Sequence, residues 1–299
     1  MWGRIRKHGF LALAVVLATL SAWAQQAAPA QAQPARRFLM WKVTSPTATV
    51  YLVGSMHLVR KDVYPLPQAV ETAFANSNVL AVEVDVKNVD KQKMSALVQQ
   101  HGVYAAGDSL SRHISKETAA ALQQFCEKYG MPCANLEPLK PWLVSTMVAL
   151  VPLQKAGADP NGGIDMHFLN QVKASQRIEE LETIEYQLSL LSTRSEDEQD
   201  KALAYSLNNI GKVHELERMY LAGDADGMLK MMADTPFREL MEKMVDERNV
   251  NMTEKVDGFL KGRETYFVVV GAAHVIGDKG IAKLLEKKNY KVEALTFEW

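Results

Sequence analysis

Two stretches of the sequence share one pattern: Thr49-Val50-Tyr51-Leu52-Val53-Gly54-Ser55-Met56-His57, and Tyr266-Phe267-Val268-Val269-Val270-Gly271-Ala272-Ala273-His274. Each opens with a run of β-branched, aromatic and aliphatic residues, which is typical of a buried strand. Each run ends in a glycine, and a histidine follows three residues later. A glycine at the end of a strand permits a tight turn or a positive φ, and it directs the next residues over the carboxyl edge of the sheet, where α/β proteins place their sites.

This repeated element predicts a site at which the two ends of the chain meet. Gly54 and Gly271 would turn the backbone so that His57 and His274 converge on one place. Gly-x-x-His also arises by chance, and a third copy at 211–214 follows no strand, so we discount it. A lone histidine is more often a residue without function, but two copies of the same strand-glycine-histidine geometry favour a functional pair.

A third component is the run Val82-Glu83-Val84-Asp85. Alternation along a strand puts Glu83 and Asp85 on the same face. A carboxylate inside an apolar strand is costly unless it is paired or metal-bound, although Asp85 also fits a strand end exposed to water. Two imidazoles and one carboxylate, from His57, His274 and Glu83, form a ligand set that leaves positions open for water on a divalent ion. Zn, Mn, Co and Fe all accept such ligands, so the sequence does not identify the metal.

The rest of the chain predicts an α/β fold. The expected strands are 39–44, 49–53, 79–84, 177–181, 266–270 and 290–295. The first two are separated by the turn signal Ser45-Pro46-Thr47 and predict a hairpin. A helix that starts at Pro65 or Pro67 leads to the third strand, and this βαβ-like unit requires a sheet that is at least partly parallel.

Residues 90–262 are expected to be mainly helical, with the strand at 177–181 among them. The expected helices include 116–129, 142–154, 164–174 and 237–260, and another lies at 280–288. We therefore predict one domain, 37–299, in which a central mixed sheet built from the two chain ends carries a helical insertion as a cap. A cap leaves a cleft against the sheet, where ligands tend to bind.

The first residues predict export. Arg4, Arg6 and Lys7 precede the apolar run 10–20, and Ala22-Trp23-Ala24 fits a cleavage site, so residues 1–24 are interpreted as a signal peptide of a secreted or periplasmic protein. The alternative is an uncleaved membrane anchor. The Ala/Gln/Pro stretch 25–36 predicts a disordered linker, and the later sequence predicts no transmembrane segment.

The net charge and the cysteine content limit the classes of partner and of covalent link that we expect. The net charge of the 299-residue chain is -1, so it has no basic excess with which to bind nucleic acid. The two cysteines, Cys126 and Cys133, flank Gly130 and Pro132. In an oxidising compartment they predict a local disulfide, and two unpaired buried thiols are the alternative.

Two further acidic segments are candidates for the functional site. Glu182 follows the mid-chain strand, where it is either a supporting or general-base carboxylate or an acid at the start of a helix. The run Asp246-Glu247-Arg248-Asn249 lies on the long late helix, and a charge cluster there is by default a solvated face.

The chain resembles the TraB/GumN family, to which the TIKI metalloproteases are related. The resemblance runs from about Phe38 to the C-terminus. It rests on both Gly-x-x-His elements and on the runs 82–85, 163–169, 180–183 with Gln187, and 247–249. It implies that His57, His274, Glu83 and Arg248 are the functional set, and it therefore favours a site role for Arg248, whose guanidinium suits bidentate or oxyanion contacts. It also implies an erythromycin-esterase and haem-uptake-like (EreA/ChaN-like) α/β fold and, from the TIKI relatives, metal-dependent peptidase activity.

The sequence thus predicts an exported metal-dependent hydrolase, peptidase-like, that acts on a peptide or small envelope substrate. A divalent ion (Mn, Co or Zn) would be held by His57, Glu83 and His274. Arg248 would stabilise developing negative charge, and Glu182 or Asp85 would be the base or a supporting carboxylate. The alternative is a non-catalytic periplasmic binding protein that uses the same pocket for a metal, haem or glycan-related ligand. The sequence indicates no oligomeric state.

Overall fold

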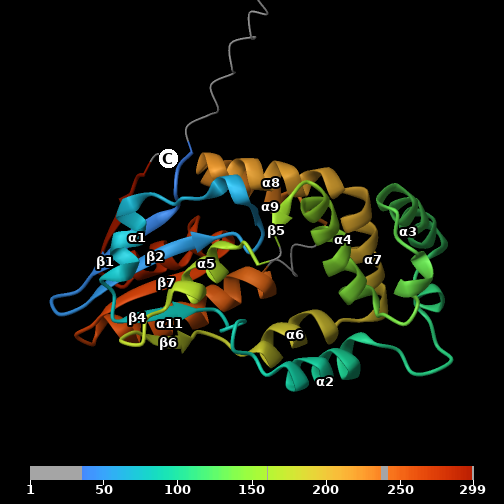
Figure 1. Cartoon of the computed structure of the whole chain (residues 1–299), viewed down its shortest axis with the longest axis horizontal. Coiled ribbons are helices and arrows are strands. Elements are labelled where there is room, and N and C mark those ends of the chain that lie inside the picture. Colours follow the sequence, from blue (N-terminus) through green and yellow to red (C-terminus); the bar gives the residue numbers. More distant parts are fainter. Residues whose placement is uncertain (1–35, 160, 237–241, 298–299) are drawn as a thin grey trace, which may run out of the picture. The chain divides into compact units, whose positions relative to one another are not determined.

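The computed structural model describes residues 36–159, 161–236 and 242–297. Within them, six strands form one sheet in the order β6-β4-β7-β2-β1-β8 (Figure 1). Their bounds are β1 Met40–Thr44, β2 Thr49–Ser55, β4 Val79–Val82, β6 Arg177–Glu180, β7 Thr265–Gly271 and β8 Lys291–Leu295. The prediction of a mixed α/β fold whose sheet includes strands from both ends of the chain is confirmed.

The sheet combines a hairpin with a parallel centre. β1 and β2 pair antiparallel, with Thr44 opposite Thr49, which confirms the predicted hairpin. β7 lies between β2 and β4 and runs parallel to both, and β6 runs parallel to β4. β8 adds antiparallel to β1 at the edge. A strand from the C-terminal part of the chain therefore occupies the middle of the N-terminal βαβ unit, and the carboxyl ends of β2, β4 and β7 share one edge.

A short two-stranded ribbon, β3 (Val59–Arg60) with β5 (Ala158–Asp159), lies outside the main sheet. The sequence did not predict it because two residues are too few for a strand periodicity. The ribbon ties the chain just after His57 to the segment that leads into helix α5 (Ile164–Gln171).

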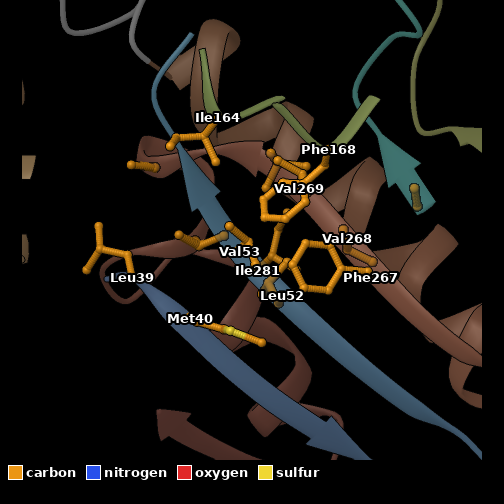
Figure 2. Close-up of a cluster of buried hydrophobic side chains, with 14 of the residues drawn as sticks. Leu39, Met40, Leu52, Val53, Ile164, Phe168, Phe267, Val268, Val269 and Ile281 are labelled. Atoms are coloured by element: carbon orange, nitrogen blue, oxygen red, sulfur yellow. The ribbon is translucent and has the colours of Figure 1, made fainter. Parts of the chain in front are cut away.

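The core surrounds β7, whose residues from Tyr266 to Val270 are buried. The Phe267 ring contacts Phe74 of α1 (Gln68–Ala75) and Phe168 of α5, with ring centroids 5.4 and 4.7 Å apart. Figure 2 shows Phe168 and Phe267 side by side, with Leu52 of β2 close to them. Burial of one such side chain contributes roughly 1.5–3 kcal/mol, which explains why the central strands are continuous apolar runs.

Helices fill most of the described chain between β4 and β7. They are α2 Lys91–Gly102, α3 Lys116–Tyr129, α4 Pro141–Lys155, α5, α6 Ile184–Ser192, α7 Glu196–Asn208, α8 Ile210–Ala222, α9 Ala225–Ala233 and α11 Arg248–Leu260. α3 has the predicted bounds because its ends carry local signals. Ser115 accepts a hydrogen bond from the Thr118 N–H, and Gly130 takes the left-handed conformation, with φ 67°.

The long predicted helix 237–260 begins outside the described residues. Its described part is a π-helix, Glu242–Glu247, followed by α11. The short α12 (Ala272–Val275) and α13 (Ile281–Lys287) follow β7. α11 contacts β2, and α13 contacts β1.

The helical part has a hydrophobic cluster of its own, formed by residues such as Leu122, Val144 and Leu203 of α3, α4 and α7, which lie together in Figure 1. A disulfide joins Cys126 to Cys133 at the end of α3, with Cα atoms 5.6 Å apart.

The predicted signal peptide, 1–24, lies outside the described residues, as does nearly all of the predicted linker, 25–36. In the described part of the chain, no helix has both the length and the apolar character needed to cross a membrane.

Candidate functional site

Adjacent parallel strands carry the two Gly-x-x-His elements. β2 and β7 pair with Ser55 opposite Gly271, so the two copies are offset by one residue. After the paired residues Ser55 and Gly271, the two segments differ in structure. After Ser55 the chain enters a loop that holds His57, whose side chain is 68% exposed. After Gly271 it forms α12, which carries His274 with a side chain only 6% exposed.

Neither motif glycine has a positive φ, so of the two expected reasons, a tight turn or a positive φ, the second does not apply. The reason at Gly54 is close packing, because a Cβ there would lie 2.7 Å from Cγ2 of Val275 and 3.3 Å from Cβ of Leu39. The missing side chain lets the segment after β7 pack directly on β2.

At Gly271 the missing side chain leaves room for the candidate site. A Cβ there would lie 3.4 Å from Oε1 of Glu83, 3.6 Å from Cδ2 of His274 and 3.8 Å from Nε2 of His57. The three candidate metal ligands are therefore all within 4 Å of one point at the carboxyl end of β7.

His57 is held by a partly buried carboxylate from α5. Its Nδ1 lies 2.9 Å from Oδ2 of Asp165, and Oδ1 of Asp165 accepts a hydrogen bond of 2.8 Å from the Ser55 hydroxyl. α5 approaches this closely because Gly163 lacks a side chain. A Cβ on Gly163 would overlap the His57 carbonyl, and the Ile164 N–H donates to the Met56 carbonyl. The contact at Nδ1 leaves Nε2 of His57 on the site side.

His274 is held in the same way by a neutral partner. Its Nδ1 lies 2.6 Å from Oδ1 of Asn249, and the amide nitrogen of Asn249 donates to the Lys279 carbonyl at 2.8 Å. The Lys279 contact fixes which end of the amide faces the ring, so Nδ1 carries the proton and Nε2 keeps its lone pair. Nε2 lies 3.8 Å from Oε1 of Glu83, too far for a hydrogen bond.

Glu83 and Glu182 form a buried pair of carboxylates with Arg248 between them. NH2 of Arg248 lies 2.6 Å from Oε2 of each glutamate, and its Nε donates to Oε1 of Glu182 at 2.9 Å. Nε2 of Gln187 also donates to both carboxylates, at 3.0 and 2.9 Å. Oε1 of Glu83 accepts the Gly271 N–H at 2.7 Å. The network fixes Glu83 with Oε1 toward the histidines.

The environment sets different protonation states on the two histidines. Asp165 raises the pKa of His57 to about 9, against the effect of desolvation. Burial lowers the pKa of His274 to about 4, against the attraction of Glu83, so this ring is neutral at pH 7. Burial alone would raise the pKa of Glu83, but His274, His57, Arg248 and the Gly271 N–H lower it to about 2.

A cavity of about 420 Å³ opens beside these groups. Its lining consists of His57, Glu83, Val84, Val86, Asn161, Asp165, Met166 and Gln187. It is an open pocket that places apolar side chains next to the polar groups, as binding sites commonly do.

Asp85 lies apart from this pocket. β4 ends at Val82, two residues before the predicted end, so the expectation that Glu83 and Asp85 share a strand face is wrong. The Asp85 carboxylate instead accepts hydrogen bonds from the backbone and side chain of Asn88 and stabilises a turn. It lines a different pocket together with Glu180.

The donor chemistry of the site fits a divalent ion. Nδ1 of each histidine is engaged by an oxygen acceptor, the arrangement by which proteins orient metal-binding imidazoles. The separation of 3.8 Å between Nε2 of His274 and Oε1 of Glu83 suits two ligands that each lie about 2.1 Å from one ion. However, no three His, Cys, Asp or Glu side chains within the described ranges are already close enough together to bind a metal.

Asp165 and Asn249, which contact Nδ1 of the two histidines, were not predicted from the sequence. Asp165 lies in the run 163–169, and Asn249 follows Arg248, so both belong to segments that were singled out. Their function depends on contacts with residues 108 and 25 positions away, respectively, and these contacts leave no pattern in the local sequence.

Comparison with known proteins adds two kinds of match. The model of the TraB/PrgY/gumN family matches residues 39–294. The uncharacterized protein YbaP of Escherichia coli (strain K12) and that of Shigella flexneri are each 24% identical to this chain over 239 residues, which cover 79% of this chain and 87% of theirs. No solved structure gives a significant match.

Proposed function

The chain belongs to the TraB/PrgY/gumN family, and on this premise we propose that it is an exported metal-dependent hydrolase that acts on peptides or other small envelope substrates. The observation that carries the proposal is the convergence of Nε2 of His57, the His274 ring and Oε1 of Glu83 around Gly271. This convergence joins three separate segments of the chain and uses a buried carboxylate, which an ordinary core would avoid.

In this proposal His57, His274 and Glu83 hold a divalent ion such as Mn, Co or Zn. When bound, such an ion supplies Lewis acidity and activates water near neutral pH. Asp165 and Asn249 orient the two imidazoles through Nδ1. His57, whose pKa of about 9 keeps the ring charged at pH 7, would release its Nε2 proton on binding the ion. The neutral state of His274 leaves its Nε2 lone pair available at pH 7.

We assign Arg248 a positioning function in place of the oxyanion role expected from the sequence. Four of its five N–H donors are used by Glu83, Glu182 and the Met244 carbonyl. Glu182 has both oxygens occupied by Arg248 and Gln187, so we assign it to balance the charge of the guanidinium and not to accept a proton. Asp85 has no part in the proposed site.

Three further features belong to the same proposal. Residues 1–24 direct the chain to the periplasm, whose oxidising conditions suit the Cys126–Cys133 disulfide. We also propose that the mixed sheet belongs to an EreA/ChaN-like fold and that the helices between β4 and β7 act as a cap over the cleft.

A hydrolysis assay tests the proposal. Purified full-length protein is incubated with a library of unstructured, quenched-fluorescent peptides and with Mn, Co or Zn added singly. We expect cleavage that a chelator abolishes. The variant His274→Ala should lose it. His214→Ala, which removes the exposed histidine of the third Gly-x-x-His copy, is the matched control and should retain it.

The same assay can contradict the proposal. Absence of cleavage with every metal, together with tight retention of a ligand by the purified protein, would favour the non-catalytic binding protein. Equal cleavage by His274→Ala and the unmodified chain would remove His274 from the mechanism.

A further inference from the structure

Gln187 has a side-chain amide whose orientation is fixed by two buried acids. It lies on α6, and its Nε2 donates to Oε2 of Glu83 at 3.0 Å and to Oε2 of Glu182 at 2.9 Å. These two hydrogen bonds use both N–H groups of the amide. A flipped amide would place its oxygen against two carboxylates, so the orientation follows from charge. Oε1 is then the one polar atom of this side chain that the acids do not engage.

The cavity beside the histidines offers few other free acceptors. Gln187 lines it next to His57, Glu83 and Asp165. Both acids already accept hydrogen bonds. The Asp165 carboxylate accepts from Ser55 and contacts His57. The Glu83 carboxylate accepts from Arg248 and from the Gly271 N–H. Val84, Val86 and Met166 are apolar. Among the described residues that line this cavity, the side-chain amides of Gln187 and Asn161 are thus the neutral groups that can accept a hydrogen bond.

We propose that Oε1 of Gln187 accepts a hydrogen bond from an N–H of the substrate beside the bond that is cleaved, so that the site prefers amides to the matching esters. The inference rests on the proposed hydrolase function and narrows its substrate class. A site that hydrogen-bonds a substrate N–H discriminates against an analogue that lacks it, because the protein acceptor then loses its partner.

Paired substrates test the inference. One peptide from the hydrolysis assay is compared with its depsipeptide. In the depsipeptide, the amide N–H proposed to donate to Gln187 is replaced by an ester oxygen. The ratio of kcat/KM for amide over ester is measured for the unmodified protein, Gln187→Met and Gln187→Glu. One hydrogen bond corresponds to a change of about fivefold in this ratio, and we expect Gln187→Met to lower the ratio by that factor.

The variant Gln187→Glu separates recognition of the substrate N–H from the hydrogen bonds that Gln187 donates to Glu83 and Glu182. As a protonated acid between two carboxylates it retains an acceptor oxygen, so we expect it to keep most of the amide preference. Gln123→Met, on the exposed side of α3 where the Gln123 amide donates to Glu127, controls for the substitution itself. Circular dichroism and thermal unfolding establish that each variant is folded.

The outcomes separate the two proposals. A lowered ratio in Gln187→Met alone supports the inference. An equal loss on amide and ester in Gln187→Met overturns it, because it shows only that Gln187 supports Glu83 and Glu182, and it leaves the hydrolase proposal intact. Absence of turnover of either substrate by the unmodified protein overturns the hydrolase proposal and the inference with it.

Discussion

Replacement of Arg248 by methionine tests the buried ion network most severely. The substitution keeps much of the side-chain volume but removes the positive charge that lies 2.6 Å from both Glu83 and Glu182. The two carboxylates are 8% and 6% exposed, so water cannot replace the guanidinium. Loss of one partner of a buried pair typically costs about 3–5 kcal/mol, and we expect the free energy of unfolding to fall by that amount at pH 8.

The loss should depend on pH in a defined direction. Without Arg248 the pKa of Glu83 rises, because burial then acts without the opposing guanidinium, so the folded variant binds protons more readily than the unfolded chain. The variant should therefore regain stability relative to the unmodified protein as the pH falls from 8 to 5. The double variant Arg248→Met/Glu182→Gln should recover roughly half of the loss, because only one buried charge then lacks a partner.

Urea unfolding of the metal-free protein at several pH values measures these changes. Arg218→Met is the matched control, since Arg218 is 73% exposed and its contact with Glu215 is 3.6 Å long, and it should cost less than about 0.5 kcal/mol. A cost below about 1 kcal/mol for Arg248→Met, or one that does not change with pH, would refute the assignment of Arg248 as the counter-ion of Glu83.

Three further predictions concern the histidines. Asp165→Asn should lower the pKa of His57 from about 9 toward 6.5, measured by NMR titration of the imidazole; an unchanged pKa would show that Asp165 does not stabilise the charged ring. Because the folded pKa of His274 is lowered to about 4, the metal-free chain should lose up to about 3 kcal/mol of stability between pH 6.5 and 4. Urea unfolding should show a smaller loss for His274→Asn, and an equal loss would contradict the assignment. Gly271→Ala puts a methyl at ordinary contact distance from the side chains of Glu83, His274 and His57, where it would fill the space for the ion. Calorimetry should therefore show weaker metal binding in a folded protein, with Gly258→Ala as the control.

The sequence predicted the elements whose signals are local. The bounds of α3 follow from Ser115 and Gly130 at its ends, and the β1–β2 hairpin follows from the turn at Ser45-Pro46-Thr47. β4 ends two residues early because the chain turns at Glu83 to reach the site, and the apolar Val84 concealed that turn. The strand propensity of a residue therefore did not decide whether the strand continued.

The candidate site was predicted only as far as the repeated motif extended. The matching stretches predicted that His57 and His274 follow two strands and converge, and those strands, β2 and β7, are paired in the structure. Their different settings, one exposed beside Asp165 and one buried beside Asn249, arise from α5 and α11. Such tertiary contacts between distant segments cannot be read from one sequence.

The proposed hydrolase activity requires one ion held jointly by the two histidines and Glu83. Elemental analysis of the native, unrefolded full-length protein tests this most directly, alongside the double variant His57→Ala/His274→Ala. We predict about one divalent ion per unmodified chain and none in the folded double variant. The same metal content in both proteins, or none in the unmodified protein even after incubation with Mn, Co or Zn, would contradict the account.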